Sequence, residues 1–506
     1  MKGHWKLALW LRRALAVLLL LAQIAFWFLA LTRNSEHFII YQLLCQIVGV
    51  LIALRVIVKP GNAGYKFMWI VFIILLPIFG VPFYVLSALP NRTKHFGKRI
   101  AAIQNERKEL FLLPQGEVHT TDLGTGTAFS YLQNHAGFPA YNDTQTAYFS
   151  CGEEFHTALL RELEKAQKYI FLEYFIIQEG KMWDPILEIL LRKAAEGVRV
   201  RVLYDEIGCF LTLPVQYPRM LAKQGIECCK FNRFVPFLST KQNNRDHRKI
   251  AVIDGAVAFT GGCNLADEYI NAIEKHGHWK DCAVLCRGSA AWSFTVMFLQ
   301  MWELATGKKE DYRHYFPPNA LQGTCEGSVQ PYADSPMDAD TVGTNVYLHV
   351  IHRARKYLWI CTPYLIPDDT LMAALCLSAK SGVDVRIITP HKWDKLLVHA
   401  TTRSYYGELI RAGVRIYEYT DGFMHAKTFV ADDDTATVGT VNLDYRSLYL
   451  HFECGVLMQN TLAVTQVKED FLRTLEHCTP IMEKECRRAL PIRILQGVLR
   501  LFAPLM

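Results

Sequence analysis

The stretch His247–Asn264 reads H-R-K-I-A-V-I-D-G-A-V-A-F-T-G-G-C-N, and a related stretch begins 178 residues later. His425–Asn442 reads H-A-K-T-F-V-A-D-D-D-T-A-T-V-G-T-V-N. Both stretches place a His, a Lys, an Asp, a Gly and an Asn at the same spacing. A single short motif is weak evidence, but the same five positions repeated in register indicate a duplicated functional element.

The spacing predicts two strands that each point a His and a Lys to the same side. His247 and Lys249 are two residues apart, as are His425 and Lys427, so on a strand the paired side chains share one face. An imidazole and an ammonium directed at one point suit a phosphate group. Two such sets would allow one imidazole to attack phosphorus while the other acts first as acid and then as base.

The repeat defines the candidate site. The candidate catalytic residues are His247, Lys249, Asp254, His425, Lys427 and Asp432, and the candidate phosphate-binding residues are Asn264 and Asn442. Asp254 and Asp432 also have a structural interpretation, because each ends its strand at a turn where a carboxylate can accept backbone N–H groups. Asp281 and Glu453 each begin an apolar run at matched points, so they are either solvated strand ends or carboxylates that orient a catalytic imidazole.

A metal centre is disfavoured, and no cofactor is expected. Paired histidines can hold zinc, but these two have Lys, and not His or Cys, as near neighbours in the sequence, and a lysine would repel a cation.

The duplication extends well beyond the motifs. The matched segments are 168–176 with 356–365, 197–203 with 382–388, 221–225 with 409–413, and 281–285 with 453–457. Strand-like runs alternate with amphipathic helical stretches in both sets, so the sequence predicts two homologous α/β halves.

The pattern H-x-K-x4-D-x6-G-[GST]-x-N, present twice, resembles the phospholipase D superfamily. The segments N-L-A-D-E-Y at 264–269 and N-L-D-Y-R-S at 442–447 resemble its bacterial cardiolipin synthase branch. The resemblance implies two phospholipase D-like halves packed as a pseudo-two-fold pair, and transfer of a phosphatidyl group through a phosphohistidine without a metal. It further implies that Glu453 orients a histidine and that the His of the first copy is the nucleophile. The two motifs are nearly symmetric, so they do not by themselves indicate which His attacks.

Three apolar segments in the first 90 residues predict transmembrane helices at about 14–32, 38–58 and 67–89. Pro77 and Pro82 are expected to kink the third. A cleaved signal peptide for the first segment is disfavoured by its length, and core helices of a soluble domain are the weaker alternative for the others.

Positive charge is concentrated beside these apolar segments. Residues 1–110 contain 14 Lys/Arg and 3 Asp/Glu, whereas the remaining chain contains 41 basic and 45 acidic residues. A nucleic-acid enzyme would carry its positive charge around the active site, so anionic membrane lipids are the expected partners and nucleic acid is not. The family resemblance implies phosphatidylglycerol among these lipids.

Basic clusters stand both before the first apolar segment and after the third, although three crossings would put them on opposite sides. The second cluster adjoins the large domain, so we expect a multi-pass protein of the cell membrane with its catalytic part in the cytoplasm. Either the N-terminal tail is exported despite its charge, or one segment does not cross.

The expected domain organisation follows from these features. It comprises a transmembrane region (1–90), a linker (91–145), a first half (146–315), a connector (316–340), a second half (341–480) and a basic amphipathic tail (481–506). The tail is expected to lie either in the lipid headgroup layer or against the enzyme body.

The expected activity is that of a membrane-bound cardiolipin synthase, which joins two phosphatidylglycerol molecules and releases glycerol. A phospholipase D that uses water, a phosphatidyltransferase with another donor or acceptor, and a catalytically inactive membrane scaffold are the alternatives. The scaffold is disfavoured because both His-x-Lys pairs are intact.

Overall fold

The computed structural model describes residues 18–29, 32, 36–87, 91–112, 127–232, 243–317, 325–338 and 340–505. The chain divides into two compact units. The N-terminal unit takes in the described residues within 1–98, 234–244 and 497–506, and the catalytic unit those within 99–233 and 245–496.

Within the described residues, one helix of the N-terminal unit is long and apolar enough to cross a membrane. It is α2 (Glu36–Val58), whose apolar part Ile39–Val58 has 20 residues. Helix Leu18–Leu29 is apolar but shorter, and the first predicted span, 14–32, lies partly outside the described residues.

The third predicted span, 67–89, is not one continuous helix. It is divided between α3 (Ala63–Leu75) and α4 (Pro77–Ser87), because Pro77 lacks the N–H that would continue the first helix. At 1.5 Å per residue, neither the 13-residue nor the 11-residue helix reaches the thickness of a bilayer core.

The exposed N–H groups at the start of α4 are satisfied by a side chain from an earlier helix. Gln23 is buried, and its Oε1 accepts hydrogen bonds from the N–H groups of Ile78 (3.0 Å) and Phe79 (3.3 Å). Such capping removes unsatisfied donors that would be costly in an apolar environment.

The catalytic unit contains two large sheets of matching topology. The first sheet has the strand order β1 (Gln145–Phe149), β8 (Ala283–Arg287), β6 (Val257–Gly261), β5 (Lys249–Ile253), β2 (Tyr169–Tyr174), β3 (Arg199–Asp205), β4 (Glu227–Phe231). The second has the order β9 (Ser328–Asp334), β16 (Glu453–Gln459), β15 (Thr435–Gly439), β14 (Thr428–Ala431), β10 (Tyr357–Cys361), β11 (Asp384–Pro390), β12 (Arg415–Tyr419), β17 (Cys478–Pro480).

The two orders correspond strand for strand, with β17 as an additional edge strand. In each sheet the three strands β2, β3 and β4, or β10, β11 and β12, are parallel, and the motif strand pairs antiparallel with the first of them. The expected pair of homologous α/β halves is therefore confirmed.

Two expectations about connecting segments differ from the structure. Strand β9 lies inside the predicted connector, because Pro331 argues against a strand in the sequence. A proline is tolerated here because β9 is an edge strand. The predicted linker is helical in its first part, where α5 (Asn91–Arg107) continues into η1 (Lys108–Leu112).

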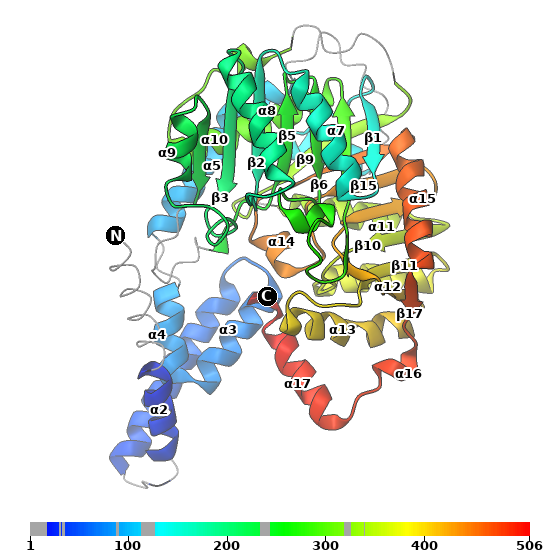
Figure 1. The fold of residues 1–506 in the computed structure, drawn as a ribbon. Helices are drawn as coiled ribbons and strands as arrows, with labels where there is room; N and C mark the ends of the chain where they lie inside the picture. Colours follow the sequence, from blue (N-terminus) through cyan, green and yellow to red (C-terminus); the bar gives the residue numbers. More distant parts are fainter. Residues whose placement is uncertain are drawn as a thin grey trace. The chain divides into compact units, whose positions relative to one another are not determined.

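Helices surround the two sheets, and Figure 1 shows α7 and α8 lying across the strands of the first. The remaining helices of the catalytic unit are α6 (Ala128–Tyr131), η2 (Leu132–Ala136), α7 (Gly152–Glu164), α8 (Trp183–Ala195), α9 (Tyr217–Ala222), η4 (Asp267–Ile270), α10 (Ala290–Thr306), η5 (Tyr312–Tyr315), α11 (Val342–Arg353), α12 (Asp369–Lys380), α13 (Leu396–Arg411), α14 (Tyr445–Tyr449), α15 (Leu462–Glu476) and α16 (Glu483–Cys486). The tail forms α17 (Leu490–Leu501) and η6 (Ala503–Leu505).

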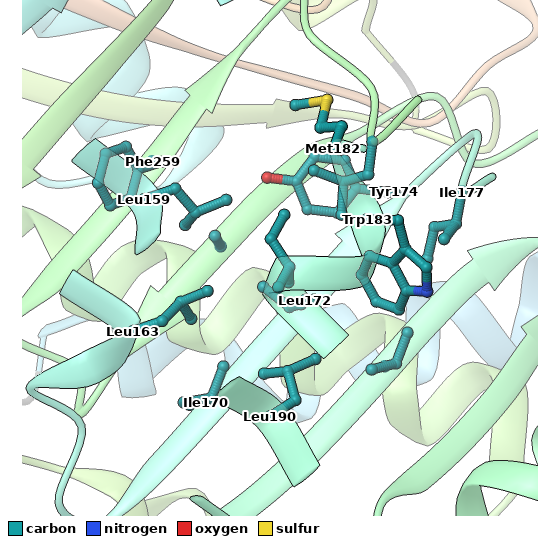
Figure 2. Close-up of a cluster of buried hydrophobic side chains, with 14 of the residues drawn as sticks. Leu159, Leu163, Ile170, Leu172, Tyr174, Ile177, Met182, Trp183, Leu190 and Phe259 are labelled. Carbon is teal, nitrogen blue, oxygen red and sulfur yellow. The ribbon is translucent and has the colours of Figure 1, made fainter. Parts of the chain in front are cut away.

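The core of the first half lies between its sheet and helices α7 and α8. Figure 2 shows Leu159 and Leu163 of α7 and Leu190 of α8 gathered with strand residues such as Leu172. Trp183 at the start of α8 is fully buried, and its indole N–H donates to the hydroxyl of Tyr217 at 2.7 Å, so its polar atom is also satisfied.

The halves are joined by backbone pairing close to both motif histidines. Strand β7 (His278–Lys280) of the first half pairs in parallel with β13 (Gly422–Met424) of the second, immediately before His425. An isolated bridge between Asp246 and Phe452 has the corresponding position before His247.

Candidate active site

Each motif histidine is anchored by its backbone to the opposite half. The N–H of His247 donates to the carbonyl of Phe452 at 2.9 Å, and the N–H of His425 donates to the carbonyl of Lys280 at 2.7 Å. Each accepting residue directly precedes one of the two matched carboxylates, since Phe452 precedes Glu453 and Lys280 precedes Asp281. The pseudo-two-fold symmetry of the halves therefore sets where both imidazoles lie.

The side chain of each motif histidine is also hydrogen-bonded to the opposite half. His247 Nδ1 lies 2.9 Å and 3.1 Å from the two carboxylate oxygens of Glu453, and His425 Nδ1 lies 2.6 Å from Asp281 Oδ2. Each carboxylate belongs to the half that does not supply the histidine. A hydrogen bond from Nδ1–H fixes the tautomer and the ring direction, and it leaves Nε2 for a substrate.

The two motif lysines lie beside these imidazoles. Lys249 Nζ donates to the carbonyl of His247 at 2.6 Å, and Lys427 Nζ donates to the carbonyl of His425. Lys427 Nζ also lies 2.9 Å from His425 Nδ1, which can accept only when it does not donate to Asp281. Both ammonium groups are buried, so their charge acts on the site with little screening.

The buried, cationic surroundings keep both imidazoles neutral. Burial, followed by the charges of Lys249 and Lys427, holds the pKa of His247 well below its usual range. Burial and Lys427 lower the pKa of His425 to about 4, against the opposing effect of Asp281. A neutral imidazole with Nδ1 held by a carboxylate is the form that can act as a nucleophile or base.

The same burial changes the other ionisable groups. It lowers the pKa of Lys249 to about 8. For Asp281, burial alone would raise the pKa, but attraction from His425 and Lys427 outweighs this and holds the pKa below its ordinary value. The carboxylate that orients His425 is therefore ionised at neutral pH.

The two carboxylates are supported differently, and the motif sequence explains why. The first copy has Gly262 where the second has Thr440. A Cβ added to Gly262 would lie only 1.9 Å from Asp281 Oδ1, so this glycine makes room for the aspartate. The hydroxyl of Thr440 instead donates to Glu453, whose longer side chain reaches His247.

The motif asparagines hold the backbone near the site. Asn264 Oδ1 accepts from the N–H of Ile176 at 3.0 Å, and its amide donates to the hydroxyl of Tyr269 at 2.7 Å. The amide of Asn442 lies 3.3 Å from Asp444, whereas its Oδ1 is buried without a partner among the described residues. Both side chains retain hydrogen-bonding capacity for a phosphate.

Asp254 and Asp432 are not placed at the histidines. Each follows its motif strand in the left-handed region, at φ 52° and 53°, and accepts three backbone N–H bonds. The donors are residues 167–169 for Asp254 and residues 355–357 for Asp432, at 2.6–3.0 Å. Each aspartate therefore links the end of its motif strand to the start of the neighbouring strand, β2 or β10.

Comparison with known proteins identifies the family. A family model described as "Cardiolipin synthase, PLD-like domain" matches residues 159–302 and 347–475, which together make up more than half of the chain. The chain belongs to this family of cardiolipin synthase, phospholipase D-like proteins. A second model, "Phospholipase D-nuclease N-terminal", matches residues 48–87, and with the apolar helix Ile39–Val58 it indicates membrane association.

Relatives extend over most of the chain. A cardiolipin synthase of Geobacillus thermodenitrificans is 39% identical over 72% of this chain and 72% of its own length. One of Halalkalibacterium halodurans is 34% identical over 92% of this chain and 94% of its own length. An uncharacterized protein of Streptococcus mutans is 43% identical over 87% and 96%, respectively.

Among solved structures, a phosphatidylserine synthase of Haemophilus influenzae matches with a TM-score of 0.58. The two chains are 16% identical, and the match covers 73% of this chain and 97% of the other. At this identity the likeness concerns the fold alone.

In this member of the cardiolipin synthase family, several site residues were not predicted from the sequence. The ring of Phe175 lies 5.2 Å from that of His247, and the rings of Trp279, Tyr269 and Phe423 lie 5.1, 5.5 and 5.9 Å from that of His425. Phe423 stands two positions before His425, and Trp279 stands two positions before Asp281, a signal that the motif pattern does not include. These rings give each imidazole an apolar neighbour.

His451 is a further missed residue. Its ring lies 5.4 Å from that of His247, and its Nδ1 is 3.8 Å from Glu453 Oε1. Together His247, His451 and Glu453 have the residue types of a metal site, with ligand atoms within 4.8 Å of one another. His247 Nδ1 and both Glu453 oxygens are already hydrogen-bonded, however, and Lys249 adds positive charge, so the donor set does not favour a cation.

Proposed function

We propose that the protein is a cardiolipin synthase, which transfers a phosphatidyl group from one phosphatidylglycerol molecule to another and releases glycerol. The observation that supports this most directly is the pair of buried, neutral imidazoles, each oriented by a carboxylate of the opposite half beside a lysine. The names of curated relatives that are 34–39% identical over most of the chain point to the same reaction.

In the first half-reaction, His247 Nε2 attacks the phosphodiester phosphorus of the donor lipid. The P–N bond forms as the P–O bond to glycerol breaks, and His425 gives its Nε2 proton to the departing oxygen. His425 has a low pKa in the free enzyme, but the bound phosphate anion favours its protonated form. Glu453 stabilises the positive charge that develops on His247.

In the second half-reaction, His425 removes the proton from a headgroup hydroxyl of the acceptor lipid. That oxygen attacks phosphorus, the P–N bond breaks, and His247 leaves as a neutral imidazole. Asp281 stabilises the imidazolium that forms on His425. Because the two histidines have nearly equivalent surroundings, we assign the covalent bond to His247 by analogy with the family.

The lysines and asparagines of the motifs are proposed to bind the phosphoryl oxygens. Lys249 and Lys427 neutralise charge as the P–O bond breaks, and the amide groups of Asn264 and Asn442 orient the phosphate. Asp254 and Asp432 are proposed to maintain the strand connections that position the lysines.

We further propose a multi-pass protein of the cell membrane with the catalytic unit in the cytoplasm and anionic lipids around it. This arrangement is supported by the basic residues that follow the apolar helices, such as Lys98 and Arg99. The domain boundaries predicted from the sequence stay a prediction. Labelling of single introduced cysteines, in a chain whose own cysteines are replaced, distinguishes the number of crossings and the side on which the catalytic unit lies.

A lipid assay tests the function. Purified full-length protein is incubated with phosphatidylglycerol vesicles, and the products are separated and identified by mass. Cardiolipin and glycerol are the expected products, and phosphatidic acid alone would identify a phospholipase D instead. No product in any lipid mixture would contradict both. His247→Ala and His425→Ala should each abolish turnover, because neither half-reaction proceeds without both imidazoles.

A further inference from the structure

Two exposed apolar loops occupy equivalent places in the two halves of the catalytic unit. The first apolar loop, residues 206–216, follows β3 and contains Leu211 and Val215, which are 92% and 70% exposed. The second apolar loop is defined as residues 391–397, which follow the equivalent strand β11 and include the first two residues of α13. It contains Trp393 and Leu397, which are 51% and 61% exposed. Large apolar side chains this exposed, at matched positions of a duplicated fold, indicate an interaction surface.

The first apolar loop is tied to the segment that contacts His247. The thiol sulfur of Cys209 accepts from the N–H of Ile177 at 3.2 Å, and the hydroxyl of Thr212 donates to the carbonyl of the same residue at 2.7 Å. Phe175, two residues earlier, places its ring against His247. The loop is therefore connected to the first imidazole through the segment 175–177.

The second apolar loop is tied to the surroundings of His425 in the same way. Tyr364 donates its hydroxyl to Asp394 at 2.5 Å and accepts from Lys395 Nζ at 2.7 Å. The ring of Tyr364 lies 6.4 Å from that of Phe423, which lies 5.9 Å from that of His425. Both apolar loops thus flank the candidate active site.

The charges around the apolar tips determine the partner that they fit. The carboxylates of the two loops are already paired, Glu206 with Lys230 and Asp394 with Lys395. Lys392 in the second loop and Lys223, shortly after the first, are exposed. Exposed apolar side chains with exposed lysines close by in the sequence, and a tryptophan among them, match the headgroup and upper acyl region of an anionic bilayer.

We propose that these two apolar loops insert into the surface of an anionic bilayer and hold both histidines at the depth of the lipid phosphates. The choice of a bilayer as partner rests on the proposed phosphatidyl transfer. The loops belong to the catalytic unit, whereas the helix that is long and apolar enough to cross a membrane, α2, belongs to the N-terminal unit.

Depth-dependent quenching tests the insertion without turnover. Full-length protein carrying His247→Ala is reconstituted into phosphatidylglycerol vesicles with or without phosphatidylcholine brominated on its acyl chains. The chain has ten tryptophans, so the contribution of Trp393 is obtained as the difference from the same protein with Trp393→Phe. We expect that contribution to be quenched by brominated lipid and protected from aqueous iodide. The opposite pattern would overturn the proposal.

Kinetics provide the second test. The double variants Leu211→Ser with Val215→Ser, and Trp393→Ser with Leu397→Ser, should reduce cardiolipin synthesis on vesicles by about tenfold each, because less apolar surface enters the membrane. Synthesis from a short-chain, monomeric phosphatidylglycerol should be unchanged. The matched controls Leu377→Ser and Leu462→Ser remove side chains of similar exposure, 60% and 64%, outside the loops and should leave both activities intact.

The outcomes are separable. Equal losses on vesicles and on monomeric lipid would mean that the loops support the active site rather than dock, and this result would contradict the proposal. If the double variants instead reduce the mass of the detergent-solubilised protein and Trp393 is not quenched, the loops join two copies of the chain. A wild-type protein that makes no cardiolipin from either substrate contradicts the proposed function, whereas the quenching result still decides whether the loops insert.

Discussion

We expect the charge of Lys249, which is proposed to bind the phosphoryl oxygens, to set the upper limit of the pH range in which the free enzyme is active. Burial lowers the pKa of its ammonium to about 8, so the group is charged below that pH and neutral above it. We expect kcat/KM for phosphatidylglycerol to fall above pH 8 with a slope of about −1 on a logarithmic scale, because one proton is lost from the free enzyme.

The variant Lys249→Arg provides the control for this prediction. A guanidinium remains charged across the accessible pH range, so any residual activity of this variant should no longer decline near pH 8. A decline of kcat/KM at the same pH in both proteins would mean that another group causes the loss of activity above pH 8. Lys427 is the first candidate, since burial also lowers its pKa.

Gly262 is predicted to be required for activity because it leaves space for the carboxylate of Asp281. A Cβ at this position would meet Asp281 Oδ1 at 1.9 Å, so Gly262→Ala should displace the carboxylate from His425. Because Asp281 acts by positioning the imidazole, we expect kcat to fall roughly tenfold to a hundredfold with little change in the thermal unfolding temperature. Gly497→Ala is the control, since a Cβ there meets nothing within 4 Å. Unchanged kcat in Gly262→Ala would show that the imidazole does not need this carboxylate.

At the scale of elements, the connection after each motif strand depends on one aspartate. Asp254 has a positive φ and accepts three backbone N–H bonds, so Asp254→Ala should destabilise the fold by roughly 2–4 kcal/mol. Asp254→Asn should reduce the stability of the fold by less, because asparagine tolerates the same backbone conformation and keeps one acceptor oxygen. Thermal unfolding and kcat per folded molecule are the measurements. A loss of kcat at unchanged stability would support a catalytic role for Asp254 instead.

The motif strands and the duplication could be predicted from the sequence, because they depend on local spacing that is repeated. The common orientation of His247 and Lys249 follows from the two-residue period of a strand alone. The partner of each histidine could not be predicted, since Glu453 is 206 residues from His247 and Asp281 is 144 residues from His425. Only the packing of the halves decides which carboxylate serves which imidazole. The contacts of His451 depend on the same packing.

Elements that are exceptions to local rules were also missed. Strand β9 contains Pro331, which normally argues against a strand and is tolerated only because β9 lies at the sheet edge. The apolar run 67–89 looks continuous in composition, but Pro77 ends one helix and begins the next. For the run 67–89 the apolar composition was predicted correctly but not the break at Pro77, whereas strand β9 lies where a connector was predicted.

At the scale of the whole catalytic unit, the two halves are held together by a buried ion pair that also supports the site. Lys280 Nζ lies 2.8 Å from both carboxylate oxygens of Asp470, which also accepts from the hydroxyl of Tyr148 at 2.7 Å. The carbonyl of the same Lys280 accepts the N–H of His425. Loss of the pair should therefore affect both stability and His425.

Asp470→Ala is expected to be the most harmful change at this interface, because it leaves the buried ammonium of Lys280 without its counter-ion. Removing one partner of a buried pair costs roughly 3–5 kcal/mol, whereas replacing both by apolar residues is often nearly neutral. The double variant Lys280→Met with Asp470→Leu should therefore unfold at a higher temperature than Asp470→Ala and recover part of the kcat. Thermal unfolding and cardiolipin synthesis, measured for Lys280→Met, for Asp470→Leu and for the double variant, give the coupling free energy. Strictly additive losses would mean that Lys280 and Asp470 stabilise the halves independently, and that the position of His425 does not depend on their pairing.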